Sequence, residues 1–198
     1  MKFLPIGCLS LLLWVGCGGK DAGKNPVIAT DDLPGAAVFA DSSLEAAVRQ
    51  ALQQPAGNLS AEGLLSLAQL DARNRGITEL KGIERLKSLT ALDLADNQIR
   101  DLAPLNALYQ LKFLNLDHNQ VNDLSPLATL SQLEVLVLDR NQVQDLTPLL
   151  GLVKLKSVEL AGNPLSQTAL NDQLPALQRR GVEVSLHAGE APVSPASP

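Results

Sequence analysis

Apolar residues recur along this chain with a period of 22 residues, in rows that begin at Leu67, Leu89, Leu111, Leu133 and Leu155. In each of the four complete rows, places 1, 4, 6, 11, 14, 17 and 20 are all apolar, and the fifth row keeps the first four of these places. A fixed period of this length is typical of solenoids, in which each coil buries its apolar face against its neighbours. The pattern therefore predicts stacked coils over residues 67–165.

Each row also predicts its own local structure. The alternation of places 4 and 6 indicates a short strand with two side chains directed into the coil, and successive strands would stack in parallel about 4.8 Å apart. Place 9, just after the strand, holds a structural ladder of asparagines: Asn97, Asn119, Asn141 and Asn163. A buried amide can both donate to and accept from backbone groups where strand pairing stops, so we interpret this ladder as structural and not catalytic.

The second half of each row predicts a short return turn. Three aspartates precede a Leu-x-Pro sequence and are expected to cap this turn, with proline at its first helical position. The residues concerned are Asp101, Asp123 and Asp145, followed by Pro104, Pro126 and Pro148.

The complete template is Leu89-Leu92-Leu94-Asn97-Ile99-Asp101-Leu102-Pro104-Leu105-Leu108, and it returns from Leu111 and from Leu133. It resembles the leucine-rich repeat family, specifically the 22-residue, internalin-like bacterial class. The resemblance implies an α/β repeat solenoid: a leucine-rich repeat arc with a short parallel sheet on its concave face. The first row departs from the template, since Arg75 replaces the asparagine and Gly82 the proline. Terminal repeats are commonly atypical in this way.

Both ends of the array carry helical signals. Before it, Ser42 and Glu45 form a capping box, and an apolar stripe follows, made of Leu44, Ala47, Val48, Ala51 and Leu52. A second helix is predicted from Ser60, with Leu59 and Leu64 spaced as a hydrophobic staple. This pair resembles the helical N-terminal cap of internalin-like proteins.

A helix and a strand are predicted after the array as its C-terminal cap. The helix has an apolar stripe and ends at Gly181, and the strand alternates apolar and polar residues. The apolar positions are Leu170, Leu174 and Leu177 in the helix and Val182, Val184 and Leu186 in the strand.

The first residues predict a secretory signal. An apolar run ends in Leu13-Trp14-Val15-Gly16-Cys17, which resembles a bacterial lipobox with Trp14 where leucine is usual. Cys17 would then be the lipid attachment site, with Cys8 as a rival and an unlipidated signal peptide as the alternative. Gly18 after the cysteine favours the outer membrane by resemblance to Gram-negative lipoproteins. The predicted organisation is 1–16 signal peptide, 17–37 flexible tether, 38–66 N-terminal cap, 67–165 repeats, 166–186 C-terminal cap and 187–198 disordered tail.

Composition narrows the classes of function. The 16 basic residues are outnumbered by 21 acidic ones, which argues against a nucleic-acid binder. The two cysteines both lie within the first 17 residues, and only His118 and His187 could support histidine-based catalysis. We therefore expect no enzyme activity, no cofactor and no small-molecule substrate. Asp117 and Asp139 could suggest a cation site, but two ligands on an open sheet are poor, so no metal is expected.

Strand alternation places the side chains of places 3, 5 and 7 on the concave face. Phe113, Val135 and Val137 cluster there although the core does not need them, with His118 and Arg140 at the edge. An apolar group with a polar rim is typical of a partner site. The alternative is that the two valines simply suit a strand. The candidate site comprises Asp93, Phe113, Asn115, Asp117, Val135, Val137, Asp139 and Glu159.

The function expected from these features is that of a lipid-anchored protein of the bacterial cell envelope, which binds a protein partner, or a glycan, through its concave face. The alternative is a structural envelope lipoprotein that organises its neighbours and has no dedicated ligand.

Overall fold

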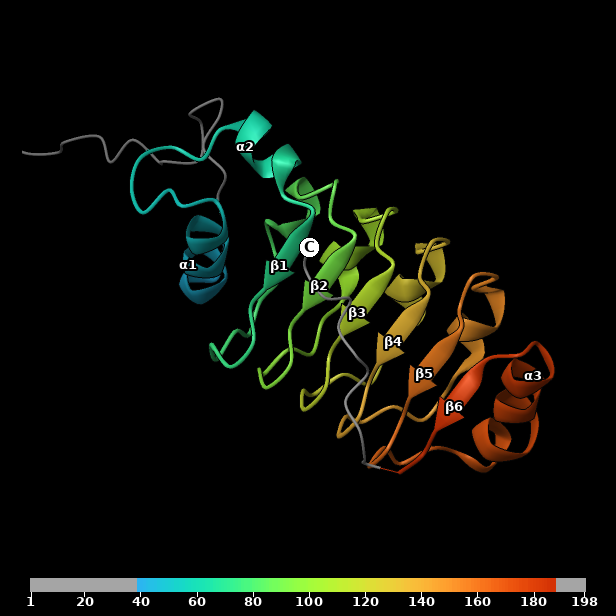
Figure 1. The fold of residues 1–198 in the computed structure, drawn as a ribbon. Helices are drawn as coiled ribbons and strands as arrows, with labels where there is room; N and C mark the ends of the chain where they lie inside the picture. Colours follow the sequence, from blue (N-terminus) through green and yellow to red (C-terminus); the bar gives the residue numbers. More distant parts are fainter. Residues whose placement is uncertain (1–38, 188–198) are drawn as a thin grey trace, which may run out of the picture. The chain divides into compact units, whose positions relative to one another are not determined.

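The computed structural model describes residues 39–187. Six short strands form one parallel sheet in sequence order, one from each of the five rows and a sixth from the C-terminal cap, and Figure 1 shows them side by side. The register pairs equivalent places of successive rows, such as Leu92 with Leu114 and Leu114 with Leu136. The strands are β1 (Gln69–Asp71), β2 (Ala91–Asp93), β3 (Phe113–Asn115), β4 (Val135–Val137), β5 (Ser157–Glu159) and β6 (Glu183–Ser185). This architecture confirms the predicted leucine-rich repeat solenoid.

The return path of each coil is a short 3₁₀ turn in place of a long helix. The four turns are η2 (Ile83–Arg85), η3 (Ala103–Ala107), η4 (Ser125–Thr129) and η5 (Thr147–Gly151). In the last three, the preceding aspartate accepts a hydrogen bond from the first backbone N–H of the turn, as between Asp101 and Ala103 at 2.8 Å. The proline stands at the second position of the turn and not at the first, as the sequence had predicted.

The core is a column of leucines between the strands and the return turns. Every apolar template place of the rows is buried, except that Leu165 in the last, incomplete row is only partly buried. Leu92, Leu94, Leu114 and Leu116 have no exposed surface at all. The interior is therefore fully used by the coils, and function is left to the side chains outside it.

The asparagine ladder joins each coil to the one before it. The side-chain oxygen of Asn119 accepts the backbone N–H of Ile99 at 3.0 Å. Its amide nitrogen donates to the carbonyl of Leu94 at 2.9 Å and to that of Leu116 at 3.1 Å. Asn97, Asn141 and Asn163 repeat this arrangement one coil away each time.

The N-terminal cap consists of α1 (Ser42–Ala51) and α2 (Ala61–Ser66). The predicted capping box is wrong, because the residue that caps α1 is Asp41. Its Oδ1 accepts the N–H groups of Ser43 and Leu44, while its Oδ2 reaches the N–H of Thr78 in the first coil at 2.8 Å. Asp41 caps the helix in place of Ser42 because its carboxylate can bond to the helix N-terminus and to the first coil at the same time.

Helix α2 is capped by Ser60, as predicted, through the N–H of Gly63. Leu59 and Leu64, the predicted staple, are both buried.

The C-terminal cap differs from the predicted helix in register. A π-helical turn, η6 (Ala169–Gln173), precedes α3 (Leu174–Arg179), and the wider turn shifts which side chains face the core. Ala169 and Gln173 are directed inward, whereas Leu170 is 38% exposed. The oxygen of the Gln173 amide accepts the N–H of Leu146 at 2.7 Å, so this side chain closes the last turn of the array.

No helix within residues 39–187 has the length and apolar character needed to cross a membrane. The predicted signal peptide, Cys17, the tether and most of the C-terminal tail lie outside the described residues.

Candidate binding surface on the concave face

The candidate surface lies on the side of the sheet opposite the core, where the side chains of places 3, 5 and 7 project. Phe113 of β3 and Val135 of β4 are paired in register and both are partly exposed. They form an apolar pair on adjacent strands, at places that the core does not use. This pair is the centre of the candidate surface.

Val137 does not belong to the exposed part of this surface, although the sequence grouped it with Phe113 and Val135. It is only 4% exposed. In the sheet it lies between Asn115 on β3 and Glu159 on β5. Alternation along a strand fixes the side to which a residue points, but its exposure depends on the neighbours across the sheet.

Three of the acidic residues on this surface have raised pKa values. For Asp93 and Asp139 the main cause is burial, which disfavours the charged carboxylate. Burial also raises the pKa of Glu159, and the nearby charges of Asp139 and Asp117 add to it. Asp117, Asp139 and Glu159 therefore lie close enough together for each charge to disfavour the next.

Asp139 has a structural contact as well. It is buried, and its Oδ1 accepts the backbone N–H of Ala161 at 2.8 Å. Asp93 and Asn115 make local contacts of a similar kind, to Ala95 N–H at 3.1 Å and Asp117 N–H at 3.0 Å. These hydrogen bonds hold the turn after each strand.

A second set of residues, several of them charged, follows the strands at place 8, where the chain turns. Each residue there has a positive φ, between 52° and 56° for Asn74, Asp96, His118 and Arg140, and Gly162 takes the same place in the last row. This left-handed backbone directs the side chains to the rim of the surface. His118 Nδ1 lies 2.9 Å from Asp96 Oδ1. Arg140 Nη2 donates to Asp117 Oδ2 at 2.5 Å.

His118 and Arg140 were expected at the edge of the surface, but their pairs with Asp96 and Asp117 were not. The signal was available, because place 8 of the rows reads Asn, Asp, His, Arg and Gly, and asparagine, aspartate and glycine are the residues that most readily adopt a positive φ.

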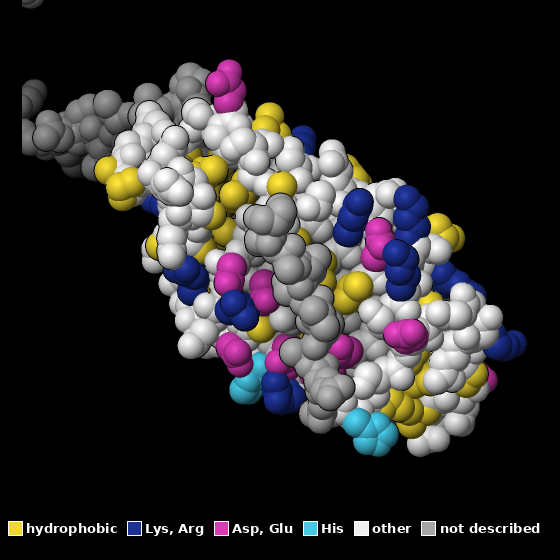
Figure 2. All heavy atoms as spheres, viewed as in Figure 1, with side chains coloured by type: hydrophobic (Ala, Val, Ile, Leu, Met, Phe, Trp, Pro, Cys, Tyr) yellow, Lys and Arg dark blue, Asp and Glu magenta, His cyan; other side chains and the backbone are white. Residues whose placement is uncertain are grey.

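The N-terminal ends of the strands carry a different charge from the C-terminal ends. Figure 2 shows Lys and Arg side chains gathered beyond the N-terminal ends of β3 to β5, while Asp and Glu side chains lie mostly toward the C-terminal ends. Lys112 and Lys156 stand at place 2 of their rows, with Glu134 between them. Lys156 forms an ion pair with Glu134, which lowers the pKa of that carboxyl. The apolar pair thus lies between the acidic C-terminal ends of the strands and their mainly basic N-terminal ends.

Among residues 39–187 there is no group of three His, Cys, Asp or Glu side chains placed to hold a metal ion. Asp117 and Asp139, which had suggested a cation site, instead contact Arg140 and the backbone of Ala161.

Comparisons with known proteins place this geometry in a family. A family model of leucine-rich repeats, two copies in length, matches residues 87–129 and again 109–151. Internalin C2 of Listeria monocytogenes has 30% sequence identity and a TM-score of 0.55, and the match covers 74% of each chain. The chain belongs to the internalin-like leucine-rich repeat family.

A second solved structure supports the same family membership. Internalin F of Listeria monocytogenes has 30% identity and a TM-score of 0.70, and the match covers 80% of this chain. The internalin-like protein spans only 46% of that longer chain. The comparison with curated protein sequences gave no match. The repeats and the internalin-like fold support a role in protein interaction.

Proposed function

We propose that this internalin-like protein binds a protein partner through its concave face and catalyses no reaction. The observation that carries the proposal is the partly exposed pair of Phe113 and Val135 at the middle of the sheet, between charged edges. Large aromatic side chains are over-represented among the residues that dominate binding energy. A polar rim around an apolar centre is the usual anatomy of such an interface.

The charges indicate the chemistry of the partner. The acidic side chains at the C-terminal ends of β2 to β5 favour basic groups, and the lysines at the other edge favour acidic ones. Such complementarity acts mainly on the rate of association and on the choice of partner. Added salt is therefore expected to slow association.

The test is a comparison of two substitutions in neighbouring rows. Phe113→Asp places a charge on the concave face. Tyr109→Asp places the same charge on the return path, where it replaces an aromatic residue that is 59% exposed. We expect the first variant to lose the proteins that co-purify with wild type from cross-linked envelope fractions, and the second to keep them. Both should melt close to wild type.

Two results would contradict the proposal. If Phe113→Asp melts far below wild type, the ring is part of the core. If both variants retain the same proteins, the protein organises the envelope by other surfaces and has no concave ligand.

We also propose that the protein is anchored in the bacterial envelope, in the outer membrane, by a lipid on Cys17. The support is the lipobox-like sequence and the tether-like segment after it. Firm attachment takes more than one acyl chain, and a diacylated, N-acylated cysteine supplies three. Cys17→Ser should abolish labelling by a fatty-acid analogue and leave the protein out of the membrane fraction, while Cys8→Ser should change neither. Equal labelling of Cys17→Ser and wild type would sink the proposal.

A further inference from the structure

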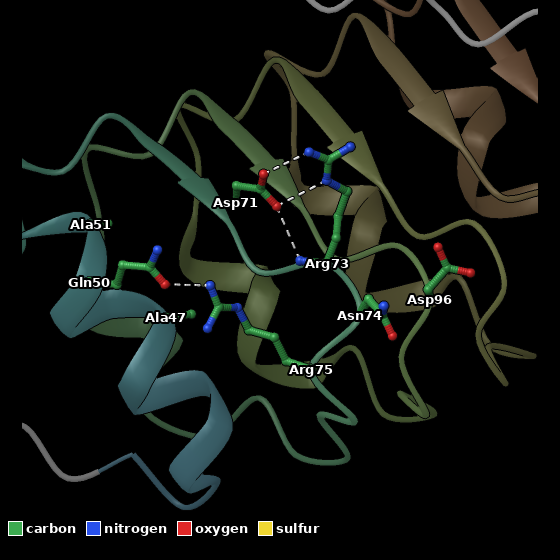
Figure 3. A pocket seen from close by; sticks show the side chains of 8 residues that line it. All are labelled: Ala47, Gln50, Ala51, Asp71, Arg73, Asn74, Arg75 and Asp96. Atoms are coloured by element: carbon green, nitrogen blue, oxygen red, sulfur yellow. Dashed lines mark hydrogen bonds and ion pairs between the residues drawn. The ribbon is translucent and has the colours of Figure 1, made fainter.

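A hollow of about 590 Å³ lies between helix α1 and the first coil, beside the start of the concave face. Figure 3 shows its walls. Ala47, Gln50 and Ala51 of α1 form one wall, and Arg73, Arg75 and Asp96 of the first two coils face them. Ala51 had been assigned to the apolar stripe of α1, but it is exposed at the edge of this hollow. The volume lies in the range of sites that hold a ligand of several residues or a small molecule.

Arg75 stands at the place that holds the ladder asparagine in the other rows. Each ladder asparagine satisfies backbone groups of the coil before it: Asn97, for example, accepts the N–H of Ile77 at 2.9 Å and donates to the carbonyl of Ala72 at 2.9 Å. The first coil has no repeat coil before it. The side chain at place 9 of this row is therefore released from the ladder and free to take another role.

The Arg75 guanidinium has few contacts for a charge in this position. Its Nη2 donates to Gln50 Oε1 at 2.7 Å, and its Nε is buried without a hydrogen-bond partner. Among the described residues it has no carboxylate partner. A guanidinium has five N–H donors, and on Arg75 those of the two terminal nitrogens that do not bond to Gln50 are open to a ligand.

The other arginine of the hollow is already paired. Arg73 donates from Nε and Nη2 to the two oxygens of Asp71, at 3.0 and 2.8 Å. Asp96 lies 2.9 Å from the imidazole of His118, which is charged only when it is protonated. The lining therefore holds two arginines and two aspartates, and Arg75 is the arginine that has no ion pair within the described residues. Beside it, the Gln50 side chain uses its oxygen for Arg75, and its amide nitrogen makes no hydrogen bond within residues 39–187.

We propose that this hollow binds the carboxyl terminus of an extended peptide, with the terminal carboxylate held by Arg75 and by the amide nitrogen of Gln50. A guanidinium and an amide N–H both donate to carboxylate oxygens, and a charge-assisted bond from the guanidinium is among the stronger hydrogen-bonded contacts. Asn74 and Asp96, on the other side of the hollow in Figure 3, offer oxygens to the backbone N–H groups of the same peptide.

The arrangement favours a peptide over an isolated carboxylate, because a second hollow on the sheet adjoins this one. A smaller depression over β1 to β3 shares Asp71 and Arg73 with it and reaches Phe113. A chain that ends at Arg75 can therefore run across the first strands toward Phe113. This extension rests on the proposed function of the concave face, whereas the carboxylate site at Arg75 does not.

The test uses two probes that differ only at the terminus: N-acetyl-tetra-alanine as the free acid and as the C-terminal amide. Each is titrated into the full-length protein and followed by NMR. We expect the acid to shift the signals of Gln50, Asn74 and Arg75 and to bind about tenfold more tightly than the amide.

Two substitutions assign the effect. Arg75→Asn introduces the residue that place 9 carries in the other rows, so folding should be kept, and the preference for the acid should disappear. Lys87→Asn removes one positive charge from the exposed return path of the same coil and should leave the preference unchanged.

Equal affinities for acid and amide, or a preference for the acid that survives in Arg75→Asn, would overturn the inference. Shifts confined to residues outside the hollow would do the same. Phe113→Asp distinguishes the two proposals: it should lose the co-purifying proteins, which tests the concave face, and it should keep the preference for the acid terminus, which depends on Arg75 and Gln50.

Discussion

The Asn119→Ala substitution tests the ladder that holds neighbouring coils together. In wild type, Asn119 makes four hydrogen bonds: one accepted from Ile99 N–H, and three donated to the carbonyls of Leu94, Leu116 and Asp117. The substitution does not affect these groups equally. Leu94 and Leu116 keep a second amide donor, from Asn97 and Asn141.

Only the buried N–H of Ile99 loses the partner that it has in the structure. An unsatisfied buried donor costs about 1–3 kcal/mol, and each lost net hydrogen bond adds about 0.5–1.5 kcal/mol. We therefore expect Asn119→Ala to lower the free energy of unfolding by about 2–4 kcal/mol. For a protein of this size that corresponds to a fall in Tm of roughly 5–15 °C.

Thermal unfolding followed by circular dichroism measures the effect, with Ser131→Ala as the control. Ser131 is exposed on the return path, and its hydroxyl makes no hydrogen bond within residues 39–187. The control should change stability by no more than about 0.5 kcal/mol. Equal melting temperatures for the two variants would refute the ladder as the source of cohesion between coils.

Two further predictions concern the cap and the acidic surface. Asp41→Ala should cost about 1–2 kcal/mol in denaturant unfolding at neutral pH, whereas Ser42→Ala should cost little. Burial acts to raise the pKa of Asp41, but the N–H groups of Thr78, Leu44, Ser43 and Glu79 outweigh it, so the pKa is lowered from 3.8 and the Asp41 contribution should be lost only at still lower pH. Glu159→Gln should raise the free energy of unfolding at pH 7 by less than about 1 kcal/mol and so raise Tm slightly. The reason is that it removes a carboxylate whose pKa is raised above 4.5 by burial and by Asp139 and Asp117. The gain should shrink as the pH falls toward 4.5, since wild-type Glu159 then becomes protonated in the folded state. A Glu159→Gln gain that is the same at pH 7 and pH 4.5 would contradict this.

The fold could be predicted because its information is local and repeated. Each row states the same alternation, the same turn and the same ladder, so an error in one row is corrected by the others. Residues such as Leu94 and Leu116 are buried for one reason, which the period alone reveals.

The caps carry no such redundancy. Asp41 and Ser42 are both good capping residues, and only the contact with Thr78 in a distant coil decides between them. The π-helical turn before α3 likewise gives no sign in the pattern of Leu170 and Leu174.

The sequence predicts on which side of the sheet the candidate surface lies, but not which of its side chains are exposed. Alternation places Phe113, Val135 and Val137 on the same face, yet two of them are partly exposed and the third is buried. The difference arises across the sheet, from residues 22 positions away in the sequence. Because the core of every coil is the same, the exposed concave side chains can vary from row to row, and their contacts with neighbouring strands decide which of them a partner can reach. A binding surface on such an array is therefore a property of adjacent rows and not of any one repeat.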